Sequence, residues 1–140
     1  MKHTCSTLVI HCMDFRFVAP TRSFLESLGL ANDYDDVSVA GAGKNLADPT
    51  GGNDAEFVLH QLATSKKLHG ITQIIIVNHL DCGAYGGAKS FANADEERNR
   101  HVGDLEIAKD VIINQLGDIS VTKVLARIDD EGKVDFEKIV

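Results

Sequence analysis

Two short apolar segments of this chain each end in residues that are common metal ligands. Residues 6–11 are mostly apolar or β-branched, and Cys12 follows them directly. Residues 73–78 contain the run Ile-Ile-Ile-Val, and His79 and Cys82 come next. Runs of this length and composition are typical of buried strands. The fold is therefore constrained by two strand ends that lie far apart in the sequence and carry similar chemistry.

Segments with helical spacing separate the strands. Pro20 can open the first helix, because proline fits a first helical turn. We expect helices over residues 21–28, 54–68 and 95–116, and strands over residues 6–11, 37–40, 73–78 and 121–128. The tail from 134 to 140 is a short return strand or a loose end. This alternation predicts an α/β fold: a mostly parallel sheet of four strands, or five with the tail, in the order 2-1-3-4 and flanked by helices.

The predicted strand order brings the candidate ligands together. In open parallel sheets, ligands bind at the carboxyl ends of the strands, where the strand order reverses. With the order 2-1-3-4, the first and third strands are neighbours. Cys12, His79 and Cys82 then meet at the point of reversal.

Size and charge exclude several classes of protein. A chain of 140 residues and 15.2 kDa suits one domain, residues 1–140. The net charge of −7 argues against partners such as nucleic acid or an anionic membrane surface. No apolar run reaches the roughly 20 residues that span a bilayer. No signal-peptide pattern precedes the first strand, so we expect a cytoplasmic protein.

The cysteines favour metal binding over disulfides. Their number, three, is odd, and cytoplasmic thiols stay reduced. Two thiolates and one imidazole suit zinc, and three protein ligands leave a fourth position open, as in catalytic zinc sites. By itself, His79-x-x-Cys82 would be better explained as a core histidine and a buried thiol. Cys12 at the neighbouring strand end makes Zn²⁺ the better interpretation.

Asp14 and Arg16 follow Cys12 closely enough to belong to the same site. The Asp14 carboxylate can take the open zinc position or orient a bound water. Arg16 can hold that carboxylate by a bidentate, charge-assisted pair.

Three motifs together resemble a known family: Cys12-x-Asp14-x-Arg16, Ala40-Gly41 and His79-x-x-Cys82-Gly83. In order and spacing they are similar to those of the β-class carbonic anhydrases, and they look like the short bacterial branch. The resemblance implies a zinc enzyme that interconverts carbon dioxide and bicarbonate by attack of zinc-bound hydroxide, assembled as a homodimer or a dimer of dimers. It also implies Cys12, His79 and Cys82 as the zinc ligands, and Asp14 with Arg16 as the carboxylate–arginine pair.

The chain departs from the family pattern around these motifs. Phe15 replaces the usual serine, Ala42 replaces an asparagine, and Asn78 replaces the glycine before the zinc histidine. Ser38-Val39 replaces an arginine–asparagine pair. A common pocket glutamine and the N-terminal helical arm have no counterpart.

These departures keep two alternatives open. One is a hydrolase of carbonyl sulfide or carbon disulfide on the same scaffold. The other is a zinc-binding protein without turnover, in which Asp14 closes the metal site.

The remaining candidates have structural explanations. Residues 41–45 contain glycines and a lysine but depart from a phosphate-binding loop at both ends; we expect the glycines to let the backbone pass close to the metal pocket. His11 is expected to be a buried structural histidine. We expect His60, His69 and His101 to be solvated on helices or helix ends, where one could relay protons.

Overall fold

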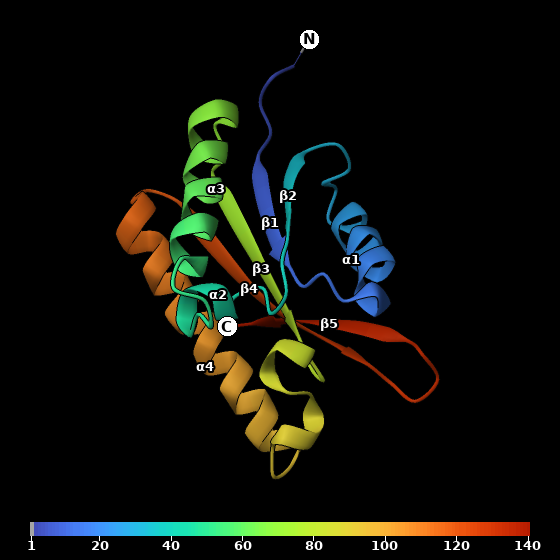
Figure 1. The fold of residues 1–140 in the computed structure, drawn as a ribbon. Helices are drawn as coiled ribbons and strands as arrows, with labels where there is room; N and C mark the ends of the chain where they lie inside the picture. Colours follow the sequence, from blue (N-terminus) through green and yellow to red (C-terminus); the bar gives the residue numbers. More distant parts are fainter. Residues whose placement is uncertain (1) are drawn as a thin grey trace.

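The fold is a five-stranded sheet with helices on both faces (Figure 1). The computed structural model describes residues 2–140. The strands are β1 (Thr7–His11), β2 (Tyr34–Ser38), β3 (Gln73–His79), β4 (Ser120–Ile128) and β5 (Val134–Ile139). Their order is β2-β1-β3-β4-β5; the first four are parallel, and β5 runs antiparallel to β4. The predicted α/β class and strand order are confirmed, with the tail as the fifth strand.

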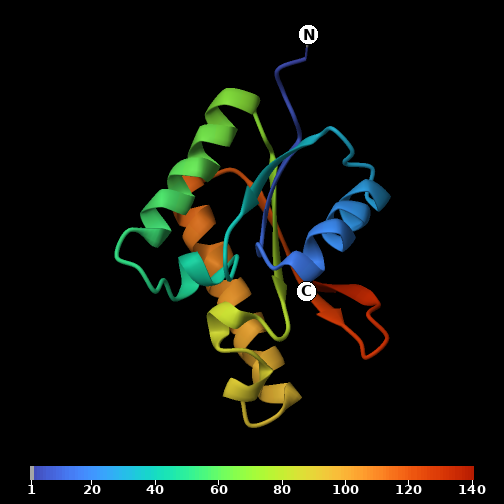
Figure 2. The same cartoon turned by 45° about the vertical axis from the view of Figure 1, so that its right-hand side comes forward.

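The helices divide unequally between the two faces of the sheet (Figure 2). They are α1 (Phe15–Ser27), α2 (Lys44–Ala47), α3 (Asp54–His69) and α4 (Ala94–Leu116), with short 3-10 turns at Gly83–Tyr85 and Ala88–Ser90. Helices α2, α3 and α4 share one core with the sheet, whereas α1 packs on the opposite face. Within residues 2–140, no helix is both long enough and apolar enough to cross a membrane.

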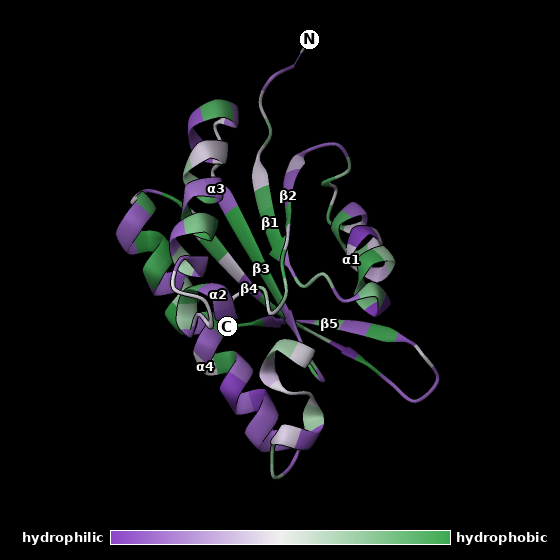
Figure 3. Ribbon diagram, viewed as in Figure 1, coloured by the Kyte–Doolittle hydropathy of each residue, from purple (hydrophilic) through white to green (hydrophobic). Residues whose placement is uncertain are grey.

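The two central strands are buried on both sides, which explains their continuous apolar runs. Successive side chains of a strand point to opposite faces. Ile74 and Ile76 therefore belong to the core under α2, α3 and α4, while Ile75 and Val77 face α1. Figure 3 shows this apolar centre, with polar residues concentrated on the outer helix surfaces.

The register of β1 and β3 brings their carboxyl ends level. His11, the last residue of β1, pairs with Val77 of β3. Cys12 therefore leaves the sheet beside the last residues of β3, which end at His79. This pairing positions the candidate metal centre.

Two element boundaries differ from the prediction. Helix α1 begins at Phe15, not near Pro20, because the Asp14 side chain caps it by accepting a hydrogen bond from the Arg16 backbone N–H. Pro20 lies inside the helix, where it removes one backbone hydrogen bond near the beginning. Strand β2 covers Tyr34–Ser38, not residues 37–40. The reason is that Asp35 and Asp36 pair with β1 through their main-chain groups.

Candidate metal centre

Three metal-binding side chains meet where β1 and β3 end. Cys12 follows β1, His79 ends β3, and Cys82 lies in the turn that follows. One donor atom from each, two sulfurs and one imidazole nitrogen, lies within 4.8 Å of the others. All three side chains are buried, with residue exposures of 6%, 2% and 2%. The structure thus brings together the three residues that were predicted from the sequence as metal ligands.

His79 presents a free nitrogen toward the cluster. Its Nδ1 lies 2.7 Å from the Leu80 carbonyl oxygen, which can only accept a hydrogen bond, so Nδ1 carries the proton. The buried Nε2 has no hydrogen-bond partner among the described residues. The Phe17 ring stacks on the imidazole at a centroid distance of 4.1 Å and fixes its orientation. A buried, unpaired nitrogen costs stability unless a ligand uses its lone pair.

The two thiols have the spacing of zinc ligands. Their sulfur atoms lie 3.9 Å apart, too far for a disulfide of about 2.05 Å. Two sulfurs bound tetrahedrally to zinc at about 2.3 Å would be separated by about 3.8 Å. The hydrogen bond from Cys82 lowers the pKa of Cys12 to about 4, and the same contact raises the pKa of Cys82. Without a metal, the two sulfurs therefore share one proton.

The backbone at Gly41 closes over the cluster, as expected from its glycines. The Gly41 N–H donates a hydrogen bond to Cys12 Sγ at 3.5 Å. Gly41 has φ +80°, and a Cβ there would lie 2.9 Å from Cβ of Ala84. Only glycine combines this conformation with this close approach.

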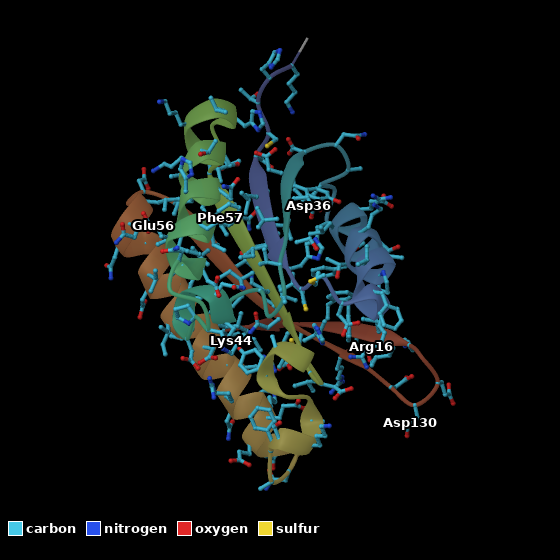
Figure 4. All side chains as sticks on the ribbon, in the orientation of Figure 1. Arg16, Asp36, Lys44, Glu56, Phe57 and Asp130 are labelled. Carbon is cyan, nitrogen blue, oxygen red and sulfur yellow. The ribbon has the colours of Figure 1, made fainter. Side chains whose placement is uncertain are left out.

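Asp14 and Arg16 form a clamp beside the three donors. The Arg16 guanidinium donates to both Asp14 oxygens, from Nη2 at 2.8 Å and from Nε at 3.1 Å. On its other side, it donates from Nη1 to the Asp81 carboxylate and from Nη2 to the Asp81 backbone oxygen, both at 3.0 Å. Figure 4 shows Arg16 at the beginning of α1, near the ends of the strands. Arg16 thus links the segment after β1 to the turn after β3.

This clamp keeps the Asp14 carboxylate ionised and outside the donor cluster. The hydrogen bonds from Arg16 hold the pKa of Asp14 below its ordinary value. Asp14 Oδ2 lies 3.7 Å from His79 Nε2. The group of mutually close donors contains Cys12, His79 and Cys82 but not Asp14.

Asn78 anchors a buried polar network behind the centre. Its Oδ1 accepts a hydrogen bond from the Gly43 N–H at 2.9 Å. Its Nδ2 donates to Tyr85 Oη and to His101 Nδ1, both at 3.2 Å. Tyr85 Oη in turn donates to Asp104 at 2.8 Å. Asn78 therefore connects β3 to the loop before α2 and to α4.

The network corrects one prediction and adds residues that the sequence reasoning missed. His101 is fully buried, not solvated, because it lies on the α4 face that also carries Asp104 and Leu105. Its helical spacing from those residues was a usable signal. Nothing comparable pointed to Tyr85, and the Asp81 contact with Arg16 was missed as well.

His11, His60 and His69 do not belong to the group of Cys12, His79 and Cys82. His11 is buried, as predicted, and its Nε2 lies 2.7 Å from Asp36 Oδ1 at the edge of the sheet. His60 is exposed on α3, also as predicted. His69 is only partly exposed, since it contacts Asp35 at 2.6 Å.

A family model and two relatives match most of this chain. A family model described as "Putative carbonic anhydrase" matches residues 1–136. An uncharacterised protein of Rickettsia conorii is 30% identical over 127 residues, covering 89% of this chain and 68% of its own length. One of Rickettsia bellii is also 30% identical over 127 residues, covering 89% and 77%.

A solved structure shows the same fold. It is a tetrameric β-carbonic anhydrase of the fungus Sordaria macrospora, which aligns with a TM-score of 0.50 and 18% identity, covering 99% of this chain and 84% of its own.

Proposed function

Because this chain belongs to the putative carbonic anhydrase family, we propose that it is a zinc enzyme that interconverts carbon dioxide and bicarbonate. The observation that carries the proposal is the buried cluster of Cys12, His79 and Cys82, with a free imidazole nitrogen and zinc-like sulfur spacing. Soft thiolates favour zinc over magnesium or calcium. Three protein ligands also leave one coordination position for a reactant. Bound there, zinc would supply Lewis-acid chemistry, lowering the pKa of water from 15.7 to near 7 and so providing a nucleophile at neutral pH.

The protein's own groups would orient the reactants. Asp14, kept ionised by Arg16, is a hydrogen-bond acceptor next to the ligand His79. It can accept a hydrogen bond from the reacting water and so fix the direction of its remaining lone pairs. The Leu80 carbonyl holds the ligand imidazole in one tautomer, and the Gly41 N–H partly offsets the charge on Cys12.

The Arg16 clamp favours an open metal site over a closed one. For Asp14 to act as a fourth ligand, its carboxylate would have to leave the guanidinium that now engages both of its oxygens. This supports turnover over the alternative of a zinc protein closed by Asp14.

Metal analysis combined with substrate assays tests the proposal. We expect the purified chain to contain zinc and to hydrate carbon dioxide, with activity rising between about pH 7 and 9 as water ionises. If the zinc-containing protein acts only on carbonyl sulfide or carbon disulfide, then that compound, and not carbon dioxide, is the substrate. If the protein contains zinc but acts on none of these substrates, it is a zinc-binding protein, and the proposed enzymatic activity is contradicted.

We also propose that the chain self-associates. Met13 and Phe15, next to the centre, are 61% and 87% exposed, which is unusual for large apolar side chains so close together. Within residues 2–140, β2 lies at the edge of the sheet and pairs with β1 alone. The similar fungal enzyme is a tetramer. Sedimentation velocity should give a dimer or a tetramer, and a monomer across the concentration range would contradict this.

A further inference from the structure

A second cluster of metal-binding side chains lies at the opposite end of the sheet. Its members are Cys5 before β1, Asp35 in β2 and His69 at the end of α3. One sulfur, one oxygen and one nitrogen of these residues lie within 4.8 Å of one another. Figure 1 shows the end of α3 and the beginnings of β1 and β2 together, far from the strands' carboxyl ends. We propose that these residues form a second site for a divalent cation of the zinc class.

Contacts from the surrounding backbone and side chains hold the three donors in place. The Cys5 N–H donates to the His69 carbonyl oxygen at 3.2 Å, which ties the N-terminal segment to the end of α3. Ser65 Oγ donates to Asp35 Oδ2 at 2.6 Å and so orients the carboxylate. Outer hydrogen bonds of this kind are typical of metal-binding carboxylates.

A hydrogen bond between Asp35 and His69 explains only part of the cluster. His69 Nδ1 lies 2.6 Å from Asp35 Oδ2, so a proton now bridges them. Oxygen and nitrogen ligands of tetrahedral zinc lie about 3.3 Å apart. Replacing the proton by the cation therefore requires these two atoms to separate by about 0.7 Å, a small side-chain movement at a partly exposed site.

The third donor, Cys5, is the one that the hydrogen bond between Asp35 and His69 leaves unexplained. Its sulfur donates a weak hydrogen bond, 3.6 Å long, to the Thr7 carbonyl oxygen. Burial and the Asp35 carboxylate raise the pKa of Cys5, so the thiol stays protonated beside an anion. A divalent cation would reverse this, because it favours the thiolate. A raised pKa also argues against a reactive, redox-active thiol.

The cluster opens into a cavity with room for the remaining coordination. The cavity has a volume of about 190 Å³, and its lining includes all three donors and His3. Either His3 or a water molecule would complete a four-coordinate site. Lys2, which also lines the cavity, pairs with Asp33 at 3.2 Å and so leaves Asp35 without a lysine partner. Mixed sulfur, nitrogen and oxygen donors suit zinc better than magnesium or calcium.

Zinc stoichiometry tests this site independently of the Cys12 centre. Metal-free wild-type chain, Cys5→Ser and His69→Gln would be dialysed to equilibrium against micromolar Zn²⁺, and bound zinc measured by mass spectrometry. His60→Gln is the matched control, because His60 is exposed on the same helix. We expect each cluster variant to bind one zinc ion per chain fewer than the wild type and His60→Gln.

A readout of stability separates lost binding from lost folding. Far-UV circular dichroism should show all four metal-free proteins folded. Added Zn²⁺ should raise the unfolding temperature of the wild type by more than that of Cys5→Ser. The second site would be overturned if wild type and Cys5→Ser bound equal amounts of zinc. It would also be overturned if His60→Gln lost as much zinc as the cluster variants.

Discussion

At the scale of single residues, Arg16 is the side chain that links the segment after β1 to the turn after β3. It touches none of the three donor side chains through a hydrogen bond, yet it holds Asp14 on one side and Asp81 on the other. Asp14 is therefore an ionised hydrogen-bond acceptor that lies outside the group of mutually close donors. We propose that Arg16 positions Asp14, a role that an experiment can separate from metal binding.

Replacing Arg16 by Gln should lower activity and spare the metal. Since outer partners of metal sites are typically worth about 10–100-fold, we expect a loss of that order in carbon dioxide hydration with unchanged zinc content. Arg22→Gln is the control, because Arg22 is exposed on the same helix and should behave as wild type. Loss of zinc from Arg16→Gln, or full activity, would contradict the positioning role.

At the scale of elements, Asn78 joins the end of β3 to three other segments: the loop before α2, the turn that carries Tyr85, and α4. Its side chain accepts a hydrogen bond from the loop before α2 and donates one to α4. The residue is only 1% exposed. Because every partner is buried, removing it leaves polar groups without hydrogen bonds.

Asn78→Ala should therefore destabilise the fold. Leaving the Gly43 N–H without its acceptor should cost about 1–3 kcal/mol in the free energy of unfolding, measured by urea denaturation of the metal-free chain. Asn99→Ala on the exposed side of α4 should change it by less than about 0.5 kcal/mol. If the two variants had the same stability, the network would not link the elements as described.

The sequence was most informative where local patterns decide structure. The β-branched runs located β1, β3 and β4, and parallel topology then predicted that Cys12 and His79 would meet. The beginning of α1 was misplaced because the Asp14 cap depends on the turn after β1. Strand β2 was misplaced because its aspartates look like turn residues until β1 pairs with them. Contacts such as that between Tyr85 and Asp104 join segments that only the folded chain brings together.

At the scale of the whole molecule, the buried histidine His101 makes stability depend on pH. Burial, together with the nearby His79, lowers the pKa of His101 from 6.5 to about 4. The unfolded chain therefore binds this proton more readily than the folded chain does between those two values. The stability that His101 contributes is fully present above about pH 6.5 and is lost as the pH falls toward 4.

His101→Gln should flatten this dependence. Between pH 7.5 and 5, the free energy of unfolding of the metal-free wild type should fall by about 2 kcal/mol more than that of His101→Gln. A glutamine at position 101 can still accept a hydrogen bond from Asn78, but its side chain does not titrate. His60→Gln should retain the wild-type slope, and parallel pH profiles for wild type and His101→Gln would contradict the buried, neutral imidazole.

X-ray absorption at the zinc edge tests the central claim most directly, because it counts the atoms around the metal. The Cys5→Ser variant is the suitable sample, since it removes the sulfur of the proposed second site. For the zinc bound to this variant at one ion per chain, we predict two sulfur neighbours at about 2.3 Å and two nitrogen or oxygen neighbours at about 2.0–2.1 Å. A spectrum with one sulfur neighbour or none would contradict a centre built from Cys12, His79 and Cys82.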